Sequence, residues 1–94
     1  MAKFTGKINT AVFISGRGSN LKSLIKYSKT KKSLIKITLV ISNNSNAKGL
    51  EYANKSKIDN IFLKYSNRGN FENRSLKLLK KKNVDLICLA GFMK

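Results

Sequence analysis

The chain has 94 residues, of which 41% are hydrophobic and 26% charged, and its 20 lysine and arginine residues against 4 acidic ones give a net charge of +16. A chain of this length forms one small domain with a thin core, because it buries only about 60–65% of its unfolded surface. This composition excludes a low-complexity segment. The strong positive charge excludes a neutral carrier protein and favours anionic partners. The sequence has no apolar run near the roughly 18 residues that a membrane span needs.

The first half of the chain predicts two strands separated by a helix. Residues 8–15 form a short apolar run, rich in β-branched side chains and followed by Gly16, which is typical of a buried strand. After the turn at 16–18, four residues have the spacing of one helix face: Leu21, Leu24, Ile25 and Ser28. The other face carries lysines 22, 26 and 29, and residues 34–42 predict a second strand.

The second half continues the same alternation. Ala47, Leu50 and Ala53 predict a short helix, and residues 60–64 predict a weaker third strand. A third helix is predicted by the spacing of Phe71, Ser75, Leu78 and Leu79. Residues 84–90 are apolar on both faces and predict a fourth strand.

This order of elements predicts an α/β fold. Strands that alternate with helices form right-handed crossovers and a Rossmann-like parallel sheet, with the order βαβαβαβ, in a single domain spanning residues 1–94. Continuous apolar strands indicate that helices cover both faces of the sheet. Ligands of such sheets bind at the carboxyl ends of the strands.

The last predicted strand, residues 84–90, ends four residues before the chain does. It is the most apolar strand, so we expect it inside a sheet, because an exposed apolar terminal strand promotes aggregation. We therefore expect that further sequence follows it, or that another chain covers it.

The high positive charge can result from the base composition of the genome rather than from a binding function. Lysine supplies 17 of the 20 basic residues, and the chain also holds 11 asparagines and 9 isoleucines, a combination typical of an AT-rich genome. Nucleic-acid surfaces usually add arginine and aromatic side chains. The three arginines, at positions 17, 68 and 74, do not cluster. A small basic nucleic-acid-binding module stays an alternative.

The strongest local motif is SGRGSNL at 15–21, between the first strand and the first helix. Its glycines allow the backbone to approach a ligand, and the helix start offers free N–H groups to an anion. Ser19 and Asn20 are good helix caps. Leu21 replaces the third glycine of the dinucleotide fingerprint, and the lysine of a P-loop is missing. The motif favours phosphate binding, and the alternative is a plain turn.

The remaining candidates are weaker. Cys88 lies in the middle of a predicted strand and is expected to be a buried core thiol. Because the chain has only one cysteine, it cannot form an internal disulfide, which indicates a reducing, cytoplasmic setting. The chain has no histidine and no paired carboxylates, so no metal site is predicted. Arg68 is either an anion ligand or a surface arginine. The N-terminus lacks the features of a secretory signal.

Three segments together resemble the phosphoribosylglycinamide formyltransferases (glycinamide ribonucleotide transformylases). These segments are ISGRGSNL at 14–21, ISNN at 41–44 followed by Ala47 and Gly49-Leu50, and LAGFMK at 89–94. Each lies at the carboxyl end of a predicted strand. The resemblance covers nearly the whole chain but only the N-terminal half of that family.

The resemblance implies a function. Members of the family transfer a formyl group from the co-substrate 10-formyltetrahydrofolate to glycinamide ribonucleotide in purine (IMP) synthesis. By similarity, Gly18, Ser19 and Asn20 bind the substrate phosphate. Arg68, Met93 and Lys94 lie on the folate side, with Lys94 where the family commonly has arginine. The family's catalytic Asn, His and Asp belong to its second half, so this chain is expected to be inactive alone.

Other functions stay open. Formyltetrahydrofolate deformylases share the fold and part of the turn, but they usually carry an extra domain before it. The chain could also be a non-catalytic stub that binds phosphate ligands or pairs with a complementing C-terminal segment. We expect neither a membrane nor a specific nucleic acid as its partner.

Overall fold

The computed structural model describes residues 8–15, 19–64 and 68–90. The elements in chain order are β1 (Ile8–Ile14), α1 (Ser19–Ser28), β2 (Ile35–Ser42), α2 (Lys48–Lys55), β3 (Asn60–Phe62), α3 (Arg68–Lys81) and β4 (Leu86–Leu89). Every predicted strand and helix is present, with small differences at the ends. No helix in the described residues is long and apolar enough to cross a membrane.

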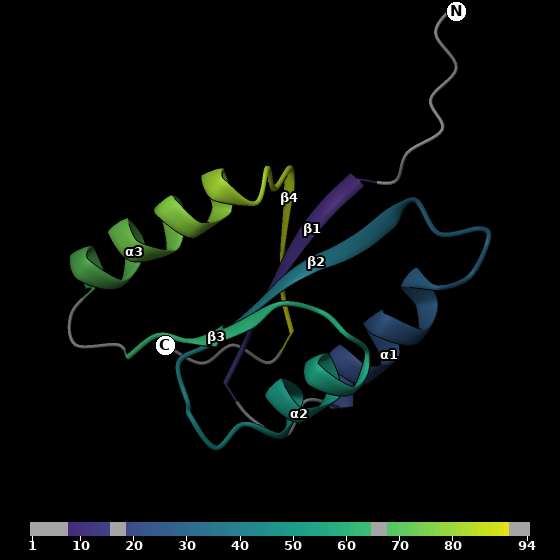
Figure 1. Cartoon of the computed structure of the whole chain (residues 1–94), viewed down its shortest axis with the longest axis horizontal. Coiled ribbons are helices and arrows are strands. Elements are labelled where there is room, and N and C mark those ends of the chain that lie inside the picture. Colours follow the sequence, from purple (N-terminus) through teal and green to yellow (C-terminus); the bar gives the residue numbers. More distant parts are fainter. Residues whose placement is uncertain (1–7, 16–18, 65–67, 91–94) are drawn as a thin grey trace, which may run out of the picture.

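The four strands form one parallel sheet in the order β3-β2-β1-β4. Helices α1 and α2 lie on one face of this sheet, and α3 lies on the other (Figure 1). The predicted α/β fold with a Rossmann-like parallel sheet is therefore confirmed. Since all strands run the same way, their carboxyl ends meet at one edge of the sheet.

The core consists of two apolar layers, one on each face of the sheet. Val12 and Ile14 of β1 pack toward α1 and α2, where Leu21 is fully buried. Ala11 and Phe13 point to the opposite face, because successive strand residues alternate. There the Phe13 and Phe71 rings meet edge to face, with centroids 6.2 Å apart. The helix periodicity read from the sequence thus identifies the buried faces of α1 and α3.

A β-bulge in β2 changes which residues face each layer. Thr10 pairs with Ile37, but Ala11 pairs with Leu39, so Thr38 is an extra residue in β2. As a result Ile37 and Val40, three positions apart, both belong to the layer beneath α1 and α2. The bulge thus determines which sheet face each residue of the second half of β2 points to, up to Ser42 at its end.

Strand β4 lies at one side of the described sheet. It is an edge strand in the described sheet, and Leu86, Ile87 and Leu89 are 40%, 49% and 68% exposed. None of the described residues forms a strand on its outer side, so the expectation that further sequence or another chain covers this strand stays a prediction. For the same reason Cys88 is only partly buried rather than a core thiol.

Candidate functional site

The connection between β1 and α1 begins and ends in the core. Strand β1 ends at Ile14 and α1 begins at Ser19, and Ile14 and Leu21 are fully buried in the same cluster. Packing therefore holds the end of the strand and the start of the helix together. The first helical N–H groups have no partner within the helix, so this start can donate hydrogen bonds to a ligand.

The helix starts differ in their charge. The first turns of α1 and α3 contain no acidic residue, whereas Glu51 lies in the first turn of α2. A carboxylate near a helix start offsets the positive end of the helix dipole. The starts of α1 and α3 consequently keep their attraction for an external anion.

The residues predicted to bind phosphate lie at the start of α1. Ser19 is its first residue, and Asn20 is exposed in its first turn. Gly18 lies outside the described residues. Asn20 is therefore accessible to a ligand at this edge of the sheet, and the phosphate role of the three residues stays a prediction.

A hydrogen-bonded turn follows β2. Ser42 is fully buried, and its Oγ donates to the Asn44 carbonyl oxygen at 2.8 Å and accepts from the Asn44 N–H at 3.0 Å. The Asn44 Oδ1 accepts from the Asn46 N–H at 2.9 Å. Because side chains satisfy these backbone groups, residues 42–46 take one defined shape.

This turn is tied to the end of β1. The Asn44 Nδ2 donates to the Ser15 carbonyl oxygen at 3.0 Å, and the Asn43 N–H donates to the Ile14 carbonyl oxygen at 3.4 Å. The residue after β1 is therefore held by a side chain 29 positions later. From the sequence alone, ISNN at 41–44 is notable only as part of the resemblance. The signal for its structural role is the alternation of serine and asparagine after a strand, which is typical of turns capped by side chains.

The residues predicted for the folate side are less fully placed. Arg68 is the first residue of α3, so its backbone lies after the carboxyl end of β3. Met93 and Lys94 lie outside the described residues. The Ala90 N–H donates to the Phe13 carbonyl oxygen at 2.9 Å, so the end of β4 lies beside the end of β1. The start of α1, the start of α3 and the ends of β1 and β4 therefore lie at the same edge of the sheet.

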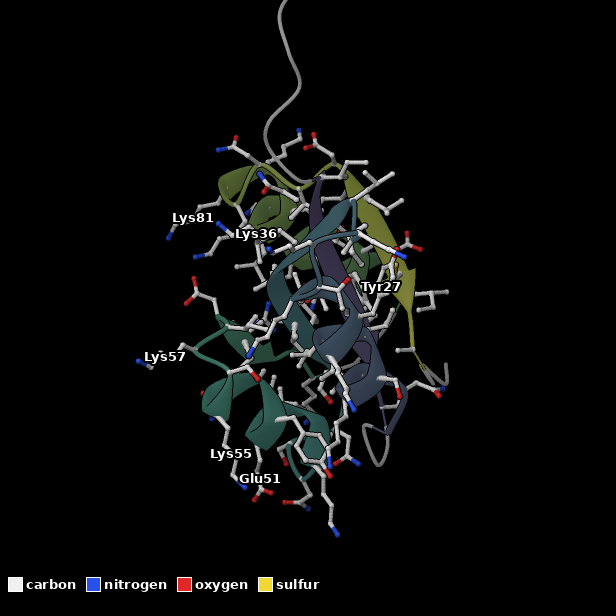
Figure 2. The ribbon with its side chains drawn as sticks, turned by 90° about the vertical axis from the view of Figure 1, so that its right-hand side faces the viewer. Tyr27, Lys36, Glu51, Lys55, Lys57 and Lys81 are labelled. Atoms are coloured by element: carbon white, nitrogen blue, oxygen red, sulfur yellow. The ribbon has the colours of Figure 1, made fainter. Side chains whose placement is uncertain are left out.

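The other charged side chains do not form a metal site in the described residues. No group of three or more His, Cys, Asp or Glu side chains there could hold a metal ion. Lys82 pairs with Asp59, which precedes β3 at the opposite sheet edge. Lys36, Lys55 and Lys81 extend away from the ribbon (Figure 2). Lys22 lies over the Tyr52 ring, with its Nζ 5.4 Å from the ring centroid.

The parallel sheet, with helix starts and polar turns at its carboxyl edge, defines a Rossmann-like α/β protein, a class that binds its ligands at this edge. The Formyl transferase family model matches residues 8–94. The chain belongs to this family.

Relatives and solved structures agree with this assignment. The chain is 39% identical to the trifunctional purine biosynthetic protein adenosine-3 of Gallus gallus, over 96% of this chain and 9% of that protein. It is 39% identical to the phosphoribosylglycinamide formyltransferase of Haemophilus influenzae, over 89% of this chain and 41% of that enzyme. The crystal structure of glycinamide ribonucleotide transformylase 1 from Symbiobacterium toebii matches with a TM-score of 0.89 and 29% identity, over 100% of this chain and 47% of that one. The chain thus spans less than half the length of these relatives.

Proposed function

We propose that the chain is the phosphate-binding N-terminal half of a phosphoribosylglycinamide formyltransferase. Such an enzyme transfers a formyl group from 10-formyltetrahydrofolate to glycinamide ribonucleotide in purine synthesis. Family membership supports the proposal, as do the names of relatives such as the Haemophilus influenzae enzyme. The match to 41% of that enzyme supports a role as one half of the catalyst.

The observation that carries the proposal is the start of α1 at the carboxyl end of β1. This start lacks an acidic residue, and the turn after β2 braces the preceding strand end through the hydrogen bond from Asn44 to Ser15. In the proposal, the backbone at Gly18 and Ser19 and the side chain of Asn20 bind the substrate phosphate. Ser42 and Asn44 act as positioning residues because they hold the two strand ends together.

The folate side completes the proposed division of roles. Arg68, at the start of α3, and the segment with Met93 and Lys94 contribute to the pocket for 10-formyltetrahydrofolate. A lysine at position 94 keeps the positive charge of the family's usual arginine but loses its planar set of donors. This change affects the rim of the pocket rather than the reacting atoms.

The chemistry itself belongs to the other half of the enzyme. In the transfer, the substrate amine bonds to the formyl carbon, the bond from that carbon to the folate nitrogen breaks, and the amine proton ends on that nitrogen. The family's catalytic Asn, His and Asp polarise the formyl group and handle the proton. The chain has no histidine. We therefore expect no transferase activity from the 94-residue chain alone.

Calorimetric titration of the chain with glycinamide ribonucleotide tests the proposal. We expect the ribonucleotide to bind at least about tenfold more tightly than the same compound without its phosphate, because a hydrogen bond to a charged group contributes about 1.5–3 kcal/mol. Asn20→Ala should weaken only the phosphorylated ligand. Asn73→Ala, which removes an exposed asparagine from α3, is the matched control.

Three results would contradict the proposal. Equal affinity for the phosphorylated and unphosphorylated ligands would exclude a phosphate site. Binding that Asn20→Ala and Asn73→Ala weaken equally would indicate nonspecific attraction to a chain of charge +16. A steep salt dependence with nonspecific duplex DNA, together with no ribonucleotide binding, would favour the nucleic-acid module.

A further inference from the structure

The connection between α1 and β2 carries many positive charges and no negative ones. Residues 26–36, which we call the basic turn, contain no aspartate or glutamate. Their lysines are at positions 26, 29, 31, 32 and 36, and all of these are exposed. The basic turn therefore forms a continuous positively charged surface.

Two large apolar side chains are exposed among these lysines. Tyr27 in the last turn of α1 is 50% exposed, and Leu34 just before β2 is 65% exposed. Figure 2 views the molecule from the side where this connection lies and labels both Tyr27 and Lys36. An exposed tyrosine offers the flat face of a ring to a binding partner. The basic turn thus combines charge with an aromatic surface.

Hydrogen bonds hold the basic turn in one shape. Ser33 is buried, and its Oγ accepts from the Ile35 N–H at 3.1 Å and donates to the Ile35 carbonyl oxygen at 3.0 Å. The Thr30 N–H donates to the Tyr27 carbonyl oxygen at 2.9 Å. The lysines therefore extend from an ordered backbone, so that less conformational freedom is lost when a ligand binds.

The basic turn lies at the opposite edge of the sheet from the proposed phosphate site. Strand β2 begins at Ile35, and the amino ends of parallel strands share one edge. Because β2 has eight residues, its two ends are about 25 Å apart. A ligand of the basic turn and a ligand at the start of α1 can therefore bind independently.

Neither the helix dipole nor base composition accounts for this pattern. Lys26 lies in the last turn of α1, where a cation is favoured by the dipole, but the four lysines that follow lie beyond the helix. Base composition can raise the number of lysines, yet it does not explain why Tyr27 is exposed between them. Like charges close together repel one another, and a bound polyanion relieves that repulsion.

We propose that the basic turn binds single-stranded nucleic acid, without sequence specificity, as a function separate from formyl transfer. The lysines contact backbone phosphates, and Tyr27 stacks on an unpaired base. A single strand suits the turn better than a duplex does, because stacking needs an unpaired base. The turn also lacks the arginines that commonly read duplex grooves. This proposal does not depend on the proposed function.

An acidic polypeptide is the main competing occupant. Its carboxylates would match the lysines equally well, but it has no bases to stack on the exposed ring of Tyr27. A membrane surface is less suited, because most of the basic turn lies outside a helix, whereas membrane surfaces select amphipathic helices. Stacking is therefore the contact that separates nucleic acid from other polyanions.

Fluorescence anisotropy with a labelled oligothymidylate of about 12 nucleotides tests the charge contacts. Each phosphate contact on a single strand adds about 0.7 to the slope of log affinity against log salt. Lys31→Gln combined with Lys32→Gln should therefore reduce that slope by about 1.4. Lys77→Gln combined with Lys80→Gln is the matched control, because it removes the same charge from exposed positions of α3 on the other sheet face (Figure 1). The control should leave the slope unchanged.

Substitution of Tyr27 tests the stacking. Tyr27→Ala should weaken oligothymidylate binding at least about fivefold without changing the salt slope, because it removes the ring and no charge. Tyr27→Phe keeps the ring and should bind as the unaltered chain does. Circular dichroism checks that each variant is folded. An oligouridylate of the same length shows whether RNA or DNA binds more tightly, and tight binding of either supports the proposal.

Three results would overturn the proposal. The α3 control could flatten the salt slope as much as the change at residues 31 and 32. Tyr27→Ala could leave the affinity unchanged. Poly-glutamate could compete as well, charge for charge, as unlabelled oligothymidylate, which would favour an acidic polypeptide. Glycinamide ribonucleotide binding is measured in parallel: if it persists without oligonucleotide binding, only this proposal fails, whereas oligonucleotide binding alone contradicts only the proposed phosphate role.

Discussion

Replacement of Ser42 by alanine tests whether the turn after β2 organises the carboxyl edge of the sheet. Ser42 is fully buried, and its hydroxyl makes two hydrogen bonds to the backbone of Asn44. Alanine keeps the Cβ atom and removes only the hydroxyl. The substitution therefore removes the hydrogen bonds without opening a large cavity.

The expected cost follows from these two contacts. Each hydrogen bond contributes about 1 kcal/mol net, and a buried group left without a partner adds a penalty. Asn44 itself is exposed, so water can satisfy part of its backbone. We expect Ser42→Ala to lower the free energy of unfolding by about 2 kcal/mol, which is about 8–16 °C in Tm for a domain of this size.

Urea unfolding followed by circular dichroism measures this change, with Ser45→Ala as the control because Ser45 is exposed in the same loop. The control should change stability by less than about 0.5 kcal/mol. Ser42→Ala should also weaken glycinamide ribonucleotide binding, because the Asn44 bond to Ser15 depends on the shape of the turn. A loss of stability below about 0.5 kcal/mol with unchanged binding would refute the reasoning.

Three further changes test other parts of the account. Leu21→Ala removes a fully buried side chain in the first turn of α1, so it should lower the free energy of unfolding in urea by about 3 kcal/mol. A decrease below about 1 kcal/mol would contradict the place of Leu21 in the core. Lys57→Gly should stabilise the chain by about 0.5 kcal/mol because Lys57 has a positive φ of 60°. Lys77→Gly, at an exposed position in the middle of α3, should instead destabilise it by about 1 kcal/mol, and the opposite order would contradict the backbone geometry. Ribose 5-phosphate should bind more weakly as the pH falls below about 6, because its phosphate then loses its second negative charge. The chain has no histidine that could gain a positive charge in the same pH range and offset this loss. Calorimetry that finds constant affinity from pH 5 to about 8 would contradict a phosphate site.

Local sequence patterns were sufficient to predict the elements of this fold. The apolar run at 8–15 and the spacing of Leu21 and Ile25 correspond to β1 and to the buried face of α1. Such patterns depend on the period of a single strand or helix, so one sequence contains the required information. The alternation of strands and helices predicts that the sheet is parallel, but it does not specify the strand order β3-β2-β1-β4.

Features that depend on contacts between distant segments were not predictable. The bulge at Thr38 is defined only by the pairing of β2 with β1, and the continuous apolar run at 34–42 carries no mark of it. The hydrogen bond from Asn44 to Ser15 joins residues 29 positions apart, once β1 and β2 are neighbours. The apolar character of β4 predicts that both of its faces are covered, but the pattern of one strand does not specify which strand lies beside it.

Mapping of amide chemical shifts during titration with glycinamide ribonucleotide tests the central claim most directly. The account predicts that the largest changes fall in the first turn of α1, at Ser19 to Leu21, and in the turn at residues 43–46. Changes spread over the exposed lysines of α1, or confined to β4 and the middle of α3, would contradict a phosphate site at the carboxyl edge of the sheet.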